Sequence, residues 1–240
     1  MSRVALVTGG TRGIGKAISV ALKEKGYKVV ANYAGNDAAA KAFSEETGIA
    51  VAKFDVGKFA ECEEAIKKIE AEHGQIEIVV NNAGITRDAV LHRMTPTQWE
   101  EVIQTNLTSC FNIARLVIDK MRANSFGRIV NIGSINGQAG QYGQVNYAAA
   151  KSGIHGFTKA LAQEGAAKGV TVNAIAPGYV DTDMVRSVPP AVLEKIIAKI
   201  PVGRLGHAED IARGVVFLVA DDADFVTGTT LSINGGQHMY

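Results

Sequence analysis

Short apolar runs rich in valine and isoleucine alternate with longer amphipathic segments from one end of the chain to the other. The amphipathic segments include Gly13–Lys25, Cys62–His73 and Thr97–Met121, which we predict to be helical. Continuous apolar strands between helices are typical of a parallel sheet that is covered on both faces. Right-handed crossovers then predict an α/β fold, a doubly wound parallel sheet of about seven strands. The predicted strands are Val4–Thr8, Lys28–Tyr33, Ala50–Phe54, Ile76–Asn81, Arg128–Ile132, Thr171–Ala176 and Thr230–Ile233.

Composition fits one globular domain over residues 1–240 and argues against several classes of partner. Of the 240 residues, 47% are hydrophobic and 20% charged, which suffices for a sizeable buried core. A net charge of +1 gives no electrostatic reason to expect nucleic acid or an anionic membrane as a partner. No apolar run reaches the roughly 20 residues that span a bilayer.

The predicted location is the cytoplasm. The first strand already begins in Arg3–Thr8, so we expect no signal peptide. Cys62 and Cys110 fall on separate predicted helices, which argues against a disulfide framework and fits a reducing compartment. We predict no metal site. One late segment, about residues 183–206, contains Pro189-Pro190 and interrupts the alternation, and we expect it to cover a substrate.

A glycine-rich loop follows the first predicted strand and opens the first predicted helix. It reads Thr8-Gly9-Gly10-Thr11-Arg12-Gly13-Ile14-Gly15, with the spacing G-x-x-x-G-x-G. Glycines let the backbone turn sharply and approach a pyrophosphate, which the amides and dipole of a helix N-terminus stabilise. A lone loop of this kind is often only a turn, but its place between a strand and a helix predicts a dinucleotide site.

The end of the second strand bears on the choice of dinucleotide. Enzymes that use NAD usually present an acidic residue there to the ribose 2′-hydroxyl. Here Asn32, Tyr33 and Ala34 stand at that point, and the first acidic residue is Asp37. Arg12, in the glycine loop, carries a guanidinium that suits a 2′-phosphate. The predicted cofactor is therefore NADPH; the alternative is that Arg12 only extends into solvent.

Tyr147 and Lys151 form the pattern Y-A-A-A-K, which places a phenol and an ammonium one turn apart on a helix. A free tyrosine has a pKa of about 10 and is a poor acid–base catalyst near neutrality. An ammonium about 4 Å away stabilises the phenolate, so we expect it to lower the phenol pKa by up to roughly 3. That change would bring the phenol into the working range of a general acid. An isolated pair at this spacing occurs by chance in many helices, so its meaning depends on the other motifs.

Several motifs occur in one order: the glycine loop, Asn81-Asn82-Ala83-Gly84, Asn106, Ser134 and the Tyr147/Lys151 pair. In this combination the chain resembles the short-chain dehydrogenase/reductase family over essentially its whole length. The resemblance implies a Rossmann-type sheet with a nicotinamide dinucleotide across the carboxyl ends of the strands. The cofactor-binding residues that it implies are Gly9, Arg12, Gly13, Ile14, Gly15, Asn32, Tyr33, Ala34, Asp55, Val56, Asn82, Ala83, Gly84, Ile85, Thr86, Tyr147, Lys151, Pro177, Gly178, Tyr179, Val180 and Thr182.

The same resemblance implies a role for each of four polar side chains. Ser134 would polarise a substrate carbonyl, and Tyr147 would donate a proton to it as hydride arrives. Lys151 would hold the ribose hydroxyls and lower the pKa of Tyr147, while Asn106 would anchor a water that relays protons to Lys151. In isolation Ser134 also suits a helix N-cap, and Asn106 suits a buried core amide. The presence of all four favours the catalytic interpretation.

Longer stretches narrow the resemblance to the acetoacetyl-CoA reductases of polyhydroxybutyrate synthesis. These stretches are Asn82–Asp88, Gly137–Tyr147, His155–Phe157 and Ser232–Met239. The resemblance implies NADPH-dependent reduction of a small-molecule thioester, acetoacetyl-CoA, to (R)-3-hydroxybutyryl-CoA by a homotetramer. The 3-oxoacyl-[acyl-carrier-protein] reductases of fatty acid synthesis share much of the pattern and are the alternative. A non-catalytic nucleotide sensor is the alternative of another class, and it is disfavoured because both members of the Tyr147/Lys151 pair are present.

Polar residues around the tyrosine are candidates for substrate contact. Gln141 and Gln144 are placed to hydrogen-bond the thioester or the pantetheine amides, and Asp88 and Tyr179 are further candidates. Loop solubility and helix capping are the alternative roles for these side chains. The predicted substrate-binding residues are Asp88, Ser134, Gln141, Gln144, Tyr147 and Tyr179.

Overall fold

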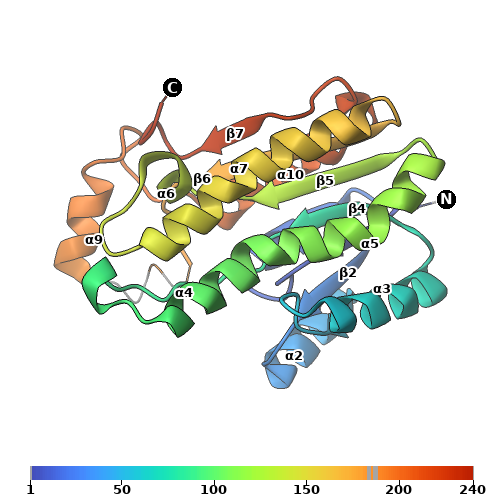
Figure 1. The fold of residues 1–240 in the computed structure, drawn as a ribbon, viewed down its shortest axis with the longest axis horizontal. Coiled ribbons are helices and arrows are strands. Elements are labelled where there is room, and N and C mark those ends of the chain that lie inside the picture. The colour runs from blue at the N-terminus through green and yellow to red at the C-terminus, as the bar shows by residue number, and fades with distance from the viewer. Residues whose placement is uncertain (1, 183–184, 186–188, 240) are drawn as a thin grey trace.

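The fold is a seven-stranded parallel sheet with helices on both faces (Figure 1). The computed structural model describes residues 2–182, 185 and 189–239. The strands lie in the order β3-β2-β1-β4-β5-β6-β7, and every neighbouring pair is parallel. Their bounds are β1 Val4–Val7, β2 Lys28–Tyr33, β3 Ala50–Lys53, β4 Ile76–Asn81, β5 Gly127–Ile132, β6 Val170–Pro177 and β7 Thr230–Ile233.

The predicted doubly wound sheet is confirmed, because each of the seven apolar runs forms a strand. The central strands β5 and β6 are buried along their whole lengths. A strand covered on both faces has no solvent side, so its sequence stays apolar instead of alternating. This is why the continuous Val- and Ile-rich runs were sufficient to locate the strands.

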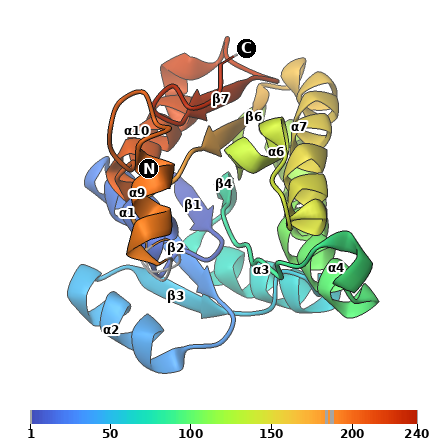
Figure 2. The ribbon, with the colours of Figure 1, turned by 90° about the vertical axis from the view of Figure 1, so that its left-hand side faces the viewer.

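The helices cover the sheet in two groups (Figure 2). Helices α1 and α10 pack on one face through Ile18, Leu22, Ile211 and Leu218, while α3 and α5 lie in the core of the other face. The helix bounds are α1 Gly13–Glu24, α2 Asp37–Thr47, α3 Phe59–His73, η1 Leu91–Arg93, α4 Pro96–Ile103, η2 Gln104–Thr108, α5 Ser109–Ala123, α6 Ile135–Ala139, α7 Val145–Ala166, α9 Pro190–Ile197, α10 Ala208–Val219 and η3 Asp221–Ala223.

The segment Thr97–Met121, predicted as one continuous helix, is interrupted. A single π-helical turn, η2, separates α4 from α5. Such turns shift the register of the side chains that follow and often occur at functional sites. Asn106 lies within this turn and is 1% exposed. The residues on both sides remain helical, so the helical spacing of apolar residues continues through this segment and does not reveal the interruption.

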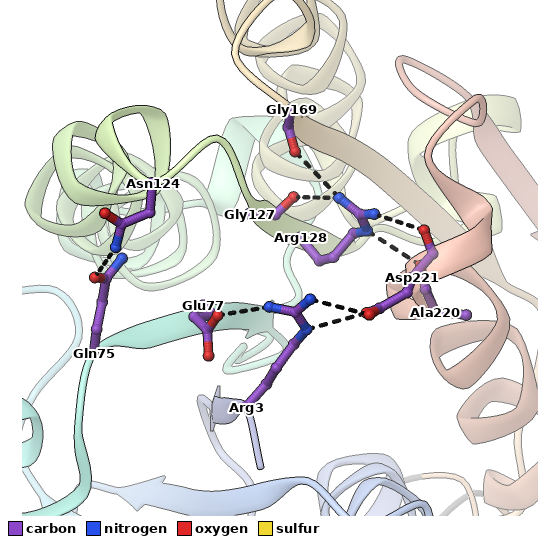
Figure 3. A network of polar contacts seen from close by, with 9 residues as sticks. All are labelled: Arg3, Gln75, Glu77, Asn124, Gly127, Arg128, Gly169, Ala220 and Asp221. Atoms are coloured by element: carbon purple, nitrogen blue, oxygen red, sulfur yellow. Dashed lines mark hydrogen bonds and ion pairs between the residues drawn. The ribbon is translucent and has the colours of Figure 1, made fainter. Parts of the chain in front are cut away.

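Charged side chains tie the amino ends of the strands together (Figure 3). Arg3 precedes β1 and donates to both carboxylate oxygens of Asp221 at 3.0 Å, and to Glu77 of β4 at 2.7 Å. Arg128 of β5 is 2% exposed, and its guanidinium donates to backbone carbonyls on every side. Those carbonyls belong to Gly127, Gly169, Ala220 and Asp221. This edge of the sheet is closed by ionic and hydrogen-bonding groups that satisfy one another.

The opposite edge, at the carboxyl ends of the strands, is built differently. The strand order reverses between β1 and β4, and ligands of doubly wound sheets bind at such a reversal. The glycine loop follows β1, Asn82 follows β4 and Ser134 follows β5 closely, so all three leave the sheet at this edge. The predicted site residues therefore meet there although they are far apart in the sequence.

Two further predictions bear on the class of protein. Both cysteines, Cys62 and Cys110, are free and buried, which confirms that they form no disulfide. None of the described helices combines the length and apolar character that crossing a membrane requires.

Candidate active site

The glycine loop after β1 requires glycine where the chain turns most tightly. Gly13 has a φ of +51°, in the left-handed region that other residues avoid. At Gly15 an added Cβ would lie 2.1 Å from the carbonyl oxygen of Gly9, which no side chain can tolerate. The loop is therefore compact enough for its backbone to approach a ligand. The sharp turn predicted from its glycines is confirmed.

The N-terminus of α1 keeps its amides available. Arg12 is the N-cap residue, and its side chain makes no capping hydrogen bond. By contrast, Thr95 and Gln98 close the N-terminus of α4 with a reciprocal capping box. Uncapped amides beside a glycine turn, with no acidic residue in the first turn, fit the phosphates of a dinucleotide.

Buried side chains hold the glycine loop from behind. The Thr8 hydroxyl accepts hydrogen bonds from the amides of Asn82 at 2.9 Å and Ala83 at 3.0 Å. The Asn82 side chain donates to the carbonyls of Thr8 and Gly9, and Asn32 Oδ1 accepts from the Gly9 amide at 3.1 Å. The side-chain amide groups of Asn32 and Asn82 therefore position the loop by hydrogen-bonding its backbone. Thr8 was not among the predicted site residues, although a hydroxyl at the end of the first strand was a visible signal.

Asn106 connects the π turn to the segment after β4. Its Oδ1 accepts from the Ile85 amide at 2.8 Å, and its Nδ2 donates to the Ile85 carbonyl at 2.9 Å. An added Cβ at Gly84 would lie 3.3 Å from Asn106 Oδ1 and 3.6 Å from Lys151 Nζ. Gly84, Asn106 and Lys151 thus meet in one place. The Asn106 side chain also fills the core-amide role that the sequence left open.

Ser134, Tyr147 and Lys151 form one cluster. Ser134 is the N-cap of α6 and accepts from the Asn136 amide at 3.1 Å, and its side chain also hydrogen-bonds the Tyr147 phenol. Lys151 Nζ lies 5.7 Å from the centre of the Tyr147 ring and donates to the Ile132 carbonyl at 2.7 Å. The helix α7 carries both Tyr147 and Lys151, as their spacing predicted.

The expected lowering of the Tyr147 pKa by Lys151 is wrong for the protein alone. Burial raises the pKa of the phenol, the hydrogen bond with Ser134 opposes that change, and the charge of Asp88 adds to it. Burial also lowers the pKa of Lys151 to about 8. The ammonium is directed to the Ile132 carbonyl instead of the phenol oxygen, so desolvation outweighs the attraction between the pair.

Polar side chains on the substrate side form a connected row. Gln144 donates to Asp88 Oδ2 at 2.8 Å and accepts from Asn136 at 2.9 Å. Asp88 raises the pKa of Tyr147 and, after burial, that of Tyr179, so its carboxylate lies near both phenols. The structure brings these predicted residues together. Gln141 is exposed, and its backbone carbonyl accepts a hydrogen bond from the Gln144 amide.

Asn146 is a functional candidate that the sequence argument missed. It is fully buried, and its Oδ1 accepts from the amide of Tyr147 at 2.8 Å. Its Nδ2 donates to the carbonyls of Arg87 and Gln98, each at 3.0 Å. One side chain thus joins the first turn of α7, the loop after β4 and helix α4. Its place directly before the tyrosine was the only signal available in the sequence.

The loop after β6 lies beside the glycine loop. An added Cβ at Gly13 would lie 3.8 Å from the Thr182 methyl. Gly178, after Pro177, packs against Asn234, and Val180 pairs with Gly206. In the segment predicted to cover a substrate, residues 183–184 and 186–188 lie outside the described residues. Its described part contains α9 and ends at the pairing with Val180.

The far end of the predicted dinucleotide site lies at β2 and β3. Asp55 Oδ1 accepts from the Gly57 amide at 2.9 Å, and Val56 is buried. Arg12 is exposed, and no described residue is its partner in an ion pair or side-chain hydrogen bond.

Within residues 2–182, 185 and 189–239, no group of histidine, cysteine, aspartate and glutamate side chains could hold a metal ion.

The family model described as enoyl-(acyl carrier protein) reductase matches residues 9–238. The chain is 66% identical to the acetoacetyl-CoA reductase of Shinella zoogloeoides over 238 residues, 99% of each chain. It is 65% identical to the acetoacetyl-CoA reductase of Rhizobium meliloti (strain 1021) over 240 residues, 100% of each chain. The 3-oxoacyl-[acyl-carrier-protein] reductase FabG of Escherichia coli (strain K12) is 46% identical over 240 residues, 99% of this chain and 98% of that one.

Proposed function

The chain belongs to the short-chain dehydrogenase/reductase family of nicotinamide-dependent oxidoreductases, and we propose that it is an NADPH-dependent acetoacetyl-CoA reductase. The product is (R)-3-hydroxybutyryl-CoA, for polyhydroxyalkanoate synthesis. The observation that carries the proposal is the cluster of Ser134, Tyr147 and Lys151 beside a glycine loop whose helix N-terminus has no side-chain cap. Gly84 lies next to Lys151, and the preceding Ala83 lies next to Gly9 of that loop. Two acetoacetyl-CoA reductases at 65–66% identity over almost the whole chain support the choice of substrate.

The cofactor is held by the backbone of the glycine loop and by the segments after β4 and β6. When bound, its nicotinamide supplies the hydride. Ser134 and Tyr147 share a hydrogen bond, so both hydroxyls are close enough to hydrogen-bond one carbonyl oxygen of the substrate. Ser134 polarises that carbonyl, and the Tyr147 phenol donates the proton to the developing alkoxide. Burial keeps the phenol protonated, which is the form that a proton donor needs.

Lys151 and Asn106 complete the site. Lys151 is buried, and its ammonium donates to the carbonyl of Ile132. It would bind the ribose hydroxyls of the cofactor. A Lys151 pKa of about 8 allows this group to give up and regain a proton near neutral pH. Asn106 fixes Ile85 and the π turn, and we assign it the anchoring of a water that replenishes the proton.

The substrate thioester lies along the row of Asp88, Gln144 and Tyr179, with Gln141 at its outer end. The described part of the late segment, residues 189–206, covers it, and the chain forms one domain around this site. An extended row of amide and carboxylate groups suits the amides of pantetheine, which need hydrogen-bond partners on both sides. NADPH is preferred over NADH because Arg12 is available for a 2′-phosphate and Tyr33 carries no carboxylate.

The enzyme acts in the cytoplasm as a homotetramer. Exposed aromatic side chains on two separate surfaces support assembly: Phe111 of α5 is 51% exposed and Phe217 of α10 is 54% exposed. Phe59 and Phe111 also contact one another with ring centres 6.4 Å apart. Contact between subunits would remove this aromatic surface from water.

A second candidate is reduction of the same 3-oxoacyl group on an acyl-carrier protein, because the Escherichia coli reductase FabG is 46% identical over 99% of the chain. Initial rates with NADPH on acetoacetyl-CoA and on acetoacetyl-carrier protein separate the two, with the product enantiomer determined by chiral chromatography. We expect the higher kcat/KM with acetoacetyl-CoA and the R product. A higher kcat/KM with the carrier protein would favour the second candidate, and no turnover of either thioester would contradict the proposal.

A further inference from the structure

Three side chains at the carboxyl ends of β2 and β3 form a charged cluster. Tyr33 and Lys53 are direct neighbours in the register of the two strands. Lys53 Nζ donates to Asp37 Oδ2 at 2.8 Å, and the Tyr33 hydroxyl also hydrogen-bonds Asp37. Lys53 and Tyr33 lower the pKa of the Asp37 carboxyl, and the hydrogen bond raises the pKa of Lys53. The charges of the Asp37 carboxylate and the Lys53 ammonium therefore neutralise each other at the exposed carboxyl edge of the sheet.

This cluster lies at the end of the second strand, where it can affect the binding of a dinucleotide. In doubly wound sheets the adenosine ribose lies at the end of the second strand, where a free carboxylate favours an unphosphorylated 2′-hydroxyl. In this chain Tyr33 occupies that point. The nearest following carboxylate in the sequence, Asp37, forms an ion pair with Lys53 at 2.8 Å. One ion pair thus contains both a group that repels a 2′-phosphate and a group that attracts it.

We infer that Asp37 and Lys53 form an exchangeable ion pair that sets the preference between phosphorylated and unphosphorylated dinucleotides. Lys53 turns from Asp37 to the 2′-phosphate of NADPH, which carries more charge than a carboxylate. Asp37 competes for the same ammonium and limits the gain, whereas the 2′-hydroxyl of NADH leaves the pair intact. The flexible stem and exposed ammonium of Lys53 allow this exchange. The inference rests on the proposed use of a nicotinamide dinucleotide, and it adds residues that Arg12 alone does not supply.

Binding measurements on the substrate-free protein test the inference. Dissociation constants for NADPH and NADH are measured by calorimetric titration for the unchanged protein, Lys53→Gln and Asp37→Asn. We expect Lys53→Gln to weaken NADPH binding about fivefold and Asp37→Asn to tighten it about threefold, as exposed charge pairs allow. Binding of NADH should change less than about twofold in both variants. Raising the ionic strength should reduce both NADPH effects, because the groups are exposed.

A matched control comes from the same helix as Asp37. Lys41 forms an exposed ion pair with Glu45, one turn apart on α2, at 3.7 Å. Lys41→Gln removes the same charge and should leave the ratio of NADPH to NADH affinity unchanged. The double variant Asp37→Asn/Lys53→Gln should lose the tightening seen with Asp37→Asn alone, since no ammonium remains to be released.

The outcomes distinguish this inference from the proposed function. If Lys53→Gln weakens NADPH and NADH equally, or no more than Lys41→Gln does, the ion pair has no part in selection and the inference is wrong. If Asp37→Asn weakens NADPH binding, competition between carboxylate and phosphate is excluded. An unchanged protein that binds neither dinucleotide would overturn the proposed function itself.

Discussion

The two edges of the sheet use the same kinds of side chain in opposite ways. At the amino edge, Arg128 is buried but donates to four backbone carbonyls, and Arg3 is paired with two carboxylates (Figure 3). At the carboxyl edge, Lys151 is equally buried, and among the described residues its ammonium donates only to the carbonyl of Ile132. Burial lowers the pKa of both cations, but that of Lys151 falls to about 8.

The difference shows where stability is sacrificed for function. A buried cation whose donors are all satisfied stabilises a structure, because removing it strands its acceptors. A buried cation with spare donors destabilises the protein until a ligand supplies the missing acceptors. The uncapped amides of α1 belong to the same pattern. The donors of the amino edge are therefore satisfied within the protein, whereas we expect a bound cofactor to supply the missing partners at the carboxyl edge.

The largest expected effect concerns Tyr147, the proposed proton donor at the carboxyl edge. Tyr147→Phe removes the phenol hydroxyl and keeps the ring, so kcat should fall by about 10²- to 10⁴-fold. NADPH affinity should change little. Tyr142 is 88% exposed in the preceding loop, and Tyr142→Phe serves as the matched control with unchanged kcat. A Tyr147→Phe enzyme with more than about a tenth of the original kcat would mean that another group donates the proton.

The second prediction breaks the amino edge. Arg128→Met fills similar volume but leaves four carbonyls without their donor, so the free energy of unfolding should fall by about 3 kcal/mol. Denaturant titration measures it, and kcat per folded molecule should not change. The control is Arg115→Met, an exposed arginine paired with Asp119, which should cost less than about 0.5 kcal/mol. A kcat loss in Arg128→Met would show that the two edges are coupled.

The third prediction concerns the cost of Lys151. Its folded pKa of about 8 lies below its ordinary value of 10.5, so the unfolded chain binds the proton more tightly. Stability of the cofactor-free protein should therefore rise with pH between about 8 and 10.5. Lys151→Met should stabilise the protein at pH 7 by about 2 kcal/mol, the pKa contribution less the hydrogen bond to Ile132.

Thermal and denaturant unfolding without cofactor check this third prediction. The gain from Lys151→Met should disappear toward pH 10, while activity is lost at every pH. Lys159→Met, on the exposed face of α7, should change stability by less than about 0.5 kcal/mol. A Lys151→Met protein that is less stable at pH 7 would show that the ammonium is fully compensated, as Arg128 is.

The fourth prediction tests the free guanidinium of the glycine loop. Arg12→Ala should weaken NADPH binding about tenfold and NADH binding less than twofold, because only the former carries a 2′-phosphate. Titration of each dinucleotide measures the two dissociation constants. Equal losses for both would place Arg12 on the pyrophosphate or in solvent, and the preference would then have to come from other residues.

The smallest effect concerns the exposed ion pair of the amino edge. The Arg3 hydrogen bond holds the pKa of Asp221 below its usual range, so the pair stabilises the protein above about pH 4 and loses this contribution as pH falls further. Asp221→Asn should cost about 0.5–1 kcal/mol at pH 6 and less at pH 3 or in high salt. A cost that stays constant with pH would assign the effect to packing instead of charge.

The sequence by itself determined the parallel sheet, the glycine loop and the place of Tyr147 and Lys151 on one helix face. These features depend on local signals: continuous apolar strands, a turn that requires glycine, and a spacing of four residues. The π turn around Asn106 was not predictable in the same way. Within the turn, Asn106 hydrogen-bonds Ile85, a residue on another segment, and the flanks of the turn keep ordinary helical periodicity.

Only the tertiary structure decided the electrostatics of the site and of the opposite edge. The sequence placed Lys151 near Tyr147, but the ammonium donates to the Ile132 carbonyl, and burial raises the pKa of the phenol. Asn146 and Arg128 likewise act through backbone groups of distant segments. Every backbone position carries the same amide and carbonyl, so sequence cannot reveal which of them a buried side chain will reach.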